Sequence, residues 1–188
     1  TQPAAPTVVN AEPDAVAQGF LDAYVANDAD RALGYLDDGG APRGSPEELR
    51  REIAWNEAAG FKQIINDCEQ PGASEPIIVC TFDFHAIGSD EIGRGPYSDN
   101  SWIFRVQDGK IISANRELPY ELNGFSAQMW EPFAAWVSTT YPDDAAVMFV
   151  NSAMELESHT DESIALWEQH TREYVDGVLQ GTIVEPSP

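Results

Sequence analysis

Basic residues are scarce in this chain: 10 Lys and Arg stand against 32 Asp and Glu, which gives a formal net charge of -22 over 188 residues. Binding to nucleic acid depends on clusters of Lys and Arg that contact phosphates, so this composition excludes nucleic acid as a partner. An anionic membrane surface would repel the chain for the same reason. The acidity therefore indicates a well-solvated surface.

Long apolar runs and metal-ligand motifs are also missing. No stretch reaches the roughly 18 apolar residues that a transmembrane helix needs, so we expect no membrane insertion. No acidic stretch has the spacing of a calcium-binding loop, and His159 and His170 lack the spacing of zinc ligands. We therefore expect no metal and no other cofactor.

Cysteine is rare as well, and the placement of the two residues is informative. Cys68 ends one strand-like run and Cys80 lies in the next, with a turn centred near Ser74 between them. In such a hairpin they lie opposite one another, within reach of a disulfide. The alternative is two buried free thiols in a cytosolic protein. We predict the disulfide and, because residues 1–11 read as a linker released from an N-terminal signal or anchor, a secreted or extracytoplasmic location.

Hydrophobic spacing predicts three helices before residue 60. The first begins near Pro13, the second covers 30–36, and the third begins with a capping box at Ser45, Pro46 and Glu48. Four strand-like runs follow, over 61–69, 77–86, 100–106 and 110–118. The dipeptide at 108–109, Asp-Gly, predicts a tight hairpin between the last two runs.

After Glu121 the pattern returns to helix. Pro132 indicates a helix that begins around Trp130, and Thr160 is the predicted N-cap of a last helix. That helix carries a narrow apolar seam of Ile164, Trp167, Thr171, Tyr174 and Val178. We therefore expect a helical C-terminal extension over 122–188 that packs on the preceding domain or on a partner.

Two segments carry a resemblance to a known superfamily. Residues 15–30 read AVAQGFLDAYVANDAD, and residues 102–112 read WIFRVQDGKII. Together they resemble the nuclear transport factor 2-like (SnoaL-like) superfamily, and residues 125–149 are similar to secreted bacterial members of it. The resemblance implies a cone-shaped α+β domain over 12–121, in which three N-terminal helices pack on a strongly bent antiparallel sheet.

Such a cone encloses an apolar pocket between the helices and the concave face of the sheet. The resemblance implies as ligand-binding residues Phe20, Tyr24, Phe82, Phe84, Asn100, Trp102, Phe104 and Arg116. The catalytic groups of the related isomerases and cyclases do not recur here, because Phe20 and Trp102 stand at two of their positions and 39–42 lacks an acid. We therefore name no catalytic residue.

Two polar features within this sheet need an explanation. Strand alternation places Asp83 and His85 opposite the Phe82 face, so they should be dispensable for binding in the cone. Arg116 shares the pocket face, and a buried guanidinium needs a partner. That partner is either an internal acid, such as Asp22 or one near Glu117, or an anionic ligand group; we expect the internal pair.

Three functions remain compatible with these features. The first is a secreted binding or accessory domain whose apolar pocket holds a small apolar or weakly anionic ligand. The second is an isomerase, cyclase or dehydratase that uses an atypical acid–base set in the same pocket. The third is a protein-interaction module with a filled cone. A homodimer would form through the convex sheet face or the C-terminal extension.

Overall fold

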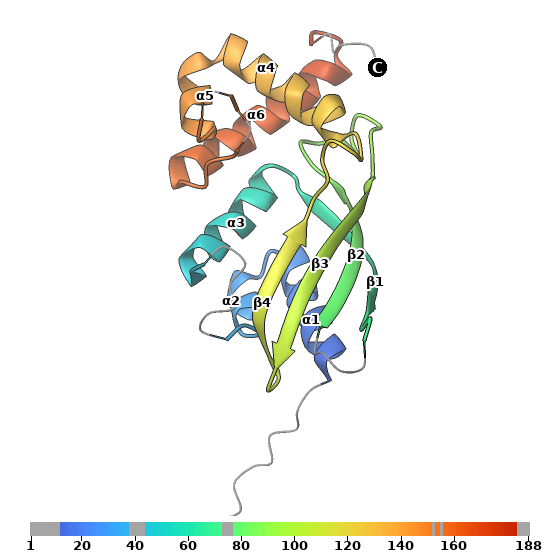
Figure 1. Ribbon diagram of the computed structural model, residues 1–188. Helices are drawn as coiled ribbons and strands as arrows, with labels where there is room; N and C mark the ends of the chain where they lie inside the picture. Colours follow the sequence, from blue (N-terminus) through green and yellow to red (C-terminus); the bar gives the residue numbers. More distant parts are fainter. Residues whose placement is uncertain (1–11, 38–43, 73–76, 152, 155, 184–188) are drawn as a thin grey trace, which may run out of the picture.

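The computed structural model describes residues 12–37, 44–72, 77–151, 153–154 and 156–183. The predicted linker at 1–11, the acid-free segment at 39–42 and the turn around Ser74 lie outside these residues. The described chain is an α+β arrangement of three N-terminal helices, a four-stranded antiparallel sheet and a helical C-terminal part (Figure 1). This is the predicted fold class.

Local sequence signals explain the three N-terminal helices. α1 (Pro13–Val25) has Pro in its first turn, and in α2 (Ala29–Leu33) the Asp28 side chain accepts from the Arg31 backbone N–H. α3 (Pro46–Ala58) begins as predicted, because Ser45 Oγ accepts from the Glu48 backbone N–H at 3.2 Å. α2 is shorter than the predicted 30–36, since the chain leaves the helix to form a parallel bridge between Leu36 and Ile111.

The sheet has the strand order β1-β2-β3-β4. Its strands are β1 (Lys62–Glu69), β2 (Ile77–His85), β3 (Tyr97–Gln107) and β4 (Lys110–Glu117). Asp108 and Gly109 both have positive φ, at 51° and 75°, as a tight hairpin requires. α1 packs across all four strands, which puts the core on that face of the sheet.

The β1–β2 hairpin carries the predicted disulfide. Cys68 pairs directly with Cys80 in the antiparallel register, and their sulfur atoms are bonded. Alternation along β2 is also as predicted: Phe82 and Phe84 are fully buried, while Asp83 and His85 are half-buried on the other face. The bridge therefore links β1 and β2 on the core face of the sheet, where Cys80 is fully buried.

The C-terminal part is helical throughout its regular elements. A single π-helical turn, η1 (Ser126–Trp130), leads into α4 (Glu131–Thr140), and α6 (Asp161–Leu179) begins at the predicted cap Thr160. Between them lies α5 (Pro142–Met148), a short helix that the spacing did not single out. Figure 1 shows these helices stacked beyond one end of the sheet, above α3.

Aromatic side chains join the C-terminal helices to the domain. Trp167 of α6 meets Trp55 of α3 edge to face at 5.3 Å between ring centroids and stacks on Trp130 at 5.7 Å. Phe125 meets Phe84 of β2 edge to face at 5.1 Å. Large rings contribute most of the apolar area that such a contact buries, so these helices pack firmly on the domain.

A buried histidine holds α5 against α6. The His170 side chain is fully buried, and its two ring nitrogens lie 2.9 Å from carboxylate oxygens of Asp144 and Glu173. Partial burial would raise the pKa of Glu173, but the hydrogen bonds from His170 and Gln169 outweigh it and hold that pKa below its ordinary value. The carboxylate is therefore stabilised in its charged form.

The approach of α6 to the domain also depends on one glycine. Gly88, in the loop after β2, has a φ of 68°, and a Cβ built on it would overlap the Val175 side chain of α6. Gly93, in the same loop, has a similar φ of 75°, but a Cβ built there would meet nothing within 4 Å among the described residues. Gly88 thus provides both a left-handed backbone and the space that α6 occupies.

Reduction of the disulfide should destabilise the protein. A bridge that spans 12 residues restricts the unfolded chain, and the chain-entropy relation gives a contribution of about 3 kcal/mol. Urea unfolding with and without a phosphine reductant measures this difference. The Cys68→Ser/Cys80→Ser variant is the control, since its unfolding should not respond to the reductant; an unchanged midpoint for the reduced wild type would contradict the prediction.

Gly88→Ala should destabilise the protein more than Gly93→Ala. Both substitutions place a side chain on a left-handed backbone, but only the first forces a methyl group into Val175. We expect the free energy of unfolding to differ between the two variants by about 1–3 kcal/mol. Adding Val175→Ala to Gly88→Ala should recover part of the loss. Equal stability of the two glycine variants would show that the packing of α6 against residue 88 does not require a glycine there.

Candidate functional site

The predicted pocket residues lie in the core and contact one another. Each of the six aromatic side chains has at most 2% of its surface exposed. Phe20 meets Trp102 and Phe104 edge to face, and Trp102 stacks on Phe104 with 7° between the ring planes. The six aromatic residues are Phe20, Tyr24, Phe82, Phe84, Trp102 and Phe104. Their role in ligand binding stays a prediction, since in this structure they pack as a core.

Asn100, another predicted ligand contact, is engaged by the backbone. Its amide Nδ2 donates to the carbonyl oxygens of Phe82 and Tyr97, at 3.1 and 2.8 Å. Its Oδ1 accepts from Asn123 Nδ2 at 3.2 Å. These bonds fasten the point where the β2–β3 register shifts between Phe82 and Phe84. Asn100 therefore holds a bulge and joins it to the start of the C-terminal part.

Arg116 is paired with an internal acid, as predicted. Its Nη2 lies 2.9 Å from Glu52 Oε1, and the two side chains are 9% and 2% exposed. Arg116 Nη1 donates to the Tyr24 hydroxyl at 2.7 Å, and that hydroxyl donates to Glu52 Oε1 at 2.8 Å. Asn56 Nδ2 also donates to the Tyr24 hydroxyl. The network joins α1, α3 and β4 at one point.

The buried network controls the protonation of its members. Burial raises the pKa of the Tyr24 hydroxyl far above its ordinary value, and the charge of Arg116 offsets only part of that rise. Burial acts against the charge of Arg116, yet Tyr24 and Glu52 raise the pKa of that guanidinium above its ordinary value. The phenol is therefore neutral and the guanidinium charged across the physiological range.

The identity of the acid corrects the sequence-based expectation, which considered Asp22 and the neighbourhood of Glu117. Asp22 is exposed and accepts from Gln18 Nε2, and Glu117 is exposed and accepts from Ser101 Oγ. Asp22 lies on a different face of α1 from Tyr24, the residue that contacts Arg116. Glu117 follows Arg116 directly on β4, so its side chain points to the opposite face of the sheet. Glu52 could have been found from its spacing, since Leu49, Glu52, Ile53 and Asn56 form one buried stripe of α3.

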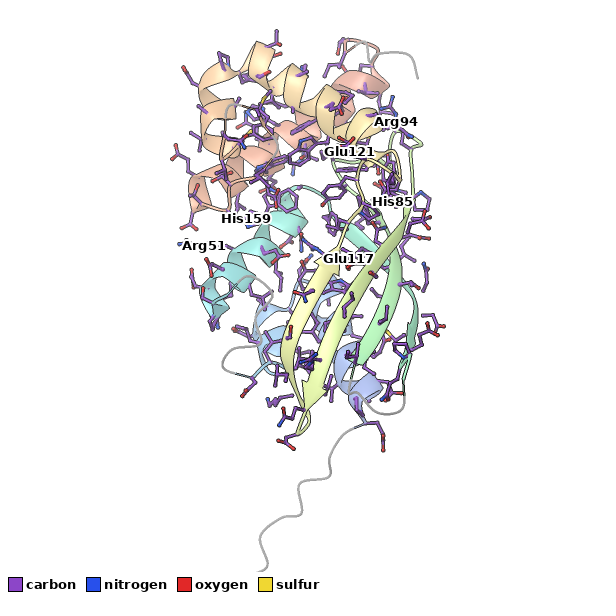
Figure 2. All side chains as sticks on the ribbon, viewed as in Figure 1. Arg51, His85, Arg94, Glu117, Glu121 and His159 are labelled. Carbon is purple, nitrogen blue, oxygen red and sulfur yellow. A yellow bond between two sulfur atoms is a disulfide. The ribbon has the colours of Figure 1, made fainter. Side chains whose placement is uncertain are left out.

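A pocket of about 450 Å³ lies where the chain passes from the sheet to the C-terminal helices. We call it the junction pocket. Its described lining residues are Tyr120, Glu121, Ser126, Trp130, Glu131, Ala134, Ala135, Ala153, Met154 and Glu157. Figure 2 shows Glu121 at this passage and His159 beside α3. The sequence pattern pointed to none of the lining residues as site residues, because most stand in loops or on a helix face without a recognisable motif.

Hydrogen bonds fix several groups of this wall. Trp130 Nε1 donates to the Met154 carbonyl oxygen at 2.8 Å, which ties the end of η1 to the segment that follows α5. Ser126 Oγ donates to Glu131 Oε1 at 3.1 Å. Glu157 Oε1 lies 3.4 Å from His159 Nε2. The pocket therefore has a fixed indole and two carboxylates whose positions are set by neighbours.

The junction pocket lies next to the buried network of Arg116. Burial acts against the charge of Arg116, and Glu157, in the wall of the pocket, adds to the rise in the pKa of Arg116 that Tyr24 and Glu52 cause. The guanidinium itself lies over the rings of Phe61 and Trp102, each 5.3 Å from its central carbon. Arg116 is paired with Glu52, and the described lining of the pocket contains three Glu side chains and no Lys, Arg or His.

A larger groove, of about 690 Å³, separates α3 from α6. Its cations are already paired at the surface: Lys62 Nζ with Asp90 at 2.7 Å, and Arg172 Nη2 with Glu168 at 3.1 Å. Exposed pairs of this kind contribute little to recognition. On the convex face of the sheet, His85 Nδ1 lies 3.1 Å from Ser89 Oγ. The hydrogen bonds of the described residues include none between His85 and Asp83. The junction pocket is the better candidate site.

Arg116→Met should strongly destabilise the protein. The substitution keeps most of the apolar volume but leaves the Glu52 carboxylate buried without its cation, so we expect the free energy of unfolding to fall by about 3–5 kcal/mol. Urea unfolding measures the change. Arg116→Met/Glu52→Gln is the matched variant and should recover most of the loss, because no charge then remains buried. A single variant as stable as the wild type would show that the pair is not essential.

Comparisons with known proteins give structural neighbours only. No protein-family model matches the chain, and no curated protein matches it. A nuclear transport factor 2-like protein from Burkholderia thailandensis E264 is 12% identical over 63% of this chain and 98% of that chain, with a TM-score of 0.47. A protein of Jannaschia sp. CCS1 assigned as a SnoaL-like polyketide cyclase is 12% identical over 68% and 96%, with a TM-score of 0.46.

A nuclear transport factor 2-like protein of unknown function from Cytophaga hutchinsonii ATCC 33406 is 14% identical over 58% of this chain and 92% of that chain, with a TM-score of 0.43. At these identities and TM-scores the likeness identifies neither a substrate nor a reaction. These three similar structures are described as nuclear transport factor 2-like or SnoaL-like proteins, the names that the sequence resemblance also gave.

Proposed function

We propose that this protein is a small-ligand-binding or accessory domain whose ligand occupies the junction pocket rather than the interior of the cone. The observation that carries the proposal is the wall of this pocket, which combines an anchored indole, a phenol ring and three carboxylates. A volume of about 450 Å³ falls within the range of about 300–1,000 Å³ that small-molecule sites occupy.

The packing of the cone interior supports this location. A ligand there would have to displace rings that already contact one another, such as Phe20, Trp102 and Phe104. Each buried aromatic side chain stabilises the core by several kcal/mol through apolar burial, and a ligand would first have to replace that contribution. The junction pocket demands no such displacement, since its space lies outside the packed core.

The same pocket is where an acid–base enzyme would have its reacting groups. Glu157 lines the pocket, and one of its carboxylate oxygens lies 3.4 Å from His159 Nε2, so a carboxylate and an imidazole stand near one another as acid–base catalysis requires. Binding is the simpler function, because it needs only the pocket wall. Turnover of a bound compound that Glu157→Gln abolishes would favour the enzyme.

We place this function outside the cytoplasm. The Cys68–Cys80 disulfide would persist in an oxidising compartment and would be reduced in most cytosols. Within the described residues, none of the helices combines the length and apolar character needed to cross a membrane. Dimerisation through the convex sheet face or the C-terminal extension stays a prediction.

Ala153→Trp should abolish small-molecule binding while the fold is kept. Ala153 is exposed and lines the junction pocket, so an indole there fills the pocket without disturbing the core. Ala146→Trp, exposed on α5 and outside the pocket wall, is the matched control. Saturation-transfer NMR with benzyl alcohol, benzoate and benzylamine should detect binding to the wild type and to Ala146→Trp only.

Two results would contradict this proposal. One is binding that survives unchanged in Ala153→Trp, which would place the ligand elsewhere. The other is the absence of binding for all three probes, which differ in charge but share one ring, at concentrations of about 10 mM. Equal thermal unfolding of the two tryptophan variants confirms that a loss of binding is not a loss of fold.

A further inference from the structure

We propose that the junction pocket selects an organic cation: an alkylated ammonium group carried on an apolar body. This inference rests on the proposed function and names its ligand class. It departs from the weakly anionic ligand that the sequence suggested, because Arg116, the group that would have received an anion, is paired with Glu52. The cavity, its charge and its aromatic rings each support a cation.

The charge of the wall is negative. Glu121, Glu131 and Glu157 line the pocket, and no described lining residue is Lys, Arg or His. Ser126 Oγ donates to one oxygen of Glu131, which fixes that carboxylate at the wall without neutralising it. The net charge of -22 adds an attractive field for cations over the whole surface. An anionic ligand would have to overcome both effects.

Two aromatic rings in the wall suit an ammonium group. The Trp130 indole is held by its bond to the Met154 carbonyl and by stacking on Trp167, so its orientation is fixed before a ligand arrives. The Tyr120 ring is held against Phe84 and Phe125. A cation near the face of such a ring is attracted by the ring quadrupole, and the attraction is strongest for Trp.

The surrounding charged groups are compatible with this choice. The charge of Arg116 also acts on Glu157, but the guanidinium is paired with Glu52 at 2.9 Å. His159 lies against Glu157 and its ring packs on Trp55, so the imidazole is not part of the lining. Among the described residues, no group of three or more His, Cys, Asp or Glu side chains converges as metal ligands. The carboxylates therefore favour a diffuse organic charge over a bare metal ion.

A matched pair of probes tests the charge alone. Choline and 3,3-dimethylbutan-1-ol have the same shape, but the first carries a quaternary nitrogen where the second has carbon. Titration calorimetry, supported by tryptophan fluorescence, should show choline binding to the wild type at least about tenfold more tightly, which corresponds to 1.4 kcal/mol. Raised salt should weaken choline binding, because exposed carboxylates are screened.

Charge-removing variants locate the effect. Glu131→Gln, which keeps an acceptor for Ser126, and Glu157→Gln should each weaken choline binding by several-fold to tenfold. Glu69→Gln removes the same charge from the exposed far end of β1 and should leave choline binding unchanged. The binding of 3,3-dimethylbutan-1-ol should be insensitive to all three variants.

Three results would overturn the cation assignment. They are equal binding of the two probes, tighter binding of benzoate than of choline, and identical effects of Glu131→Gln and Glu69→Gln. No choline binding at about 10 mM would overturn it as well. If benzyl alcohol still binds and Ala153→Trp still abolishes that binding, the proposed small-ligand function stands while the cation is rejected. If Ala153→Trp has no effect on any probe, the pocket itself is rejected.

Discussion

The ion pair between Arg116 and Glu52 is the constraint around which the domain is arranged. Two charges removed from water are tolerated only when they meet each other and when their other hydrogen bonds are satisfied. Here the pair lies 2.9 Å apart, and the Tyr24 hydroxyl donates to Glu52 while it accepts from Arg116 and Asn56. Because the four residues come from α1, α3 and β4, the charges fix how the helices sit on the sheet.

The same pair shapes what the domain can bind. A guanidinium that an internal carboxylate neutralises is no longer a receptor for anions, and the rings beside it fill the cone. A ligand in the interior would have to displace rings that already contact one another, and it would find the buried guanidinium already paired. The binding surface that we propose therefore lies where the sheet ends and the helices begin.

A continuous series of aromatic contacts joins the sheet to the C-terminal helices. Ring contacts lead from Phe84 to Phe125, from Phe125 to Trp130 and from Trp130 to Trp167. The predicted boundary near Glu121 is a change in sequence pattern, but the packing is continuous across it. The Trp130 indole in the wall of the junction pocket is held by its bond to Met154 and by its contact with Trp167, so a ligand would not have to order that ring.

The sequence by itself determined the features that depend on neighbouring residues. The cap at Ser45, the hairpin at Asp108 and Gly109, the alternation of β2 and the facing cysteines were all predicted, because backbone periodicity and turn chemistry act locally. The resemblance added the fold class. Burial of Arg116 with an internal acid was predicted from the cost of an unpaired charge.

Only the tertiary structure decided which acid that is and where a ligand has room. Glu52 and Arg116 stand far apart in the sequence, and periodicity reports that a face is buried without saying what it faces. The junction pocket brings together residues after β4, residues of η1 and α4, and Met154 and Glu157. Loop residues carry no periodic signal, and a cavity is the space left between elements that approach from distant parts of the chain, so no local pattern could have placed it.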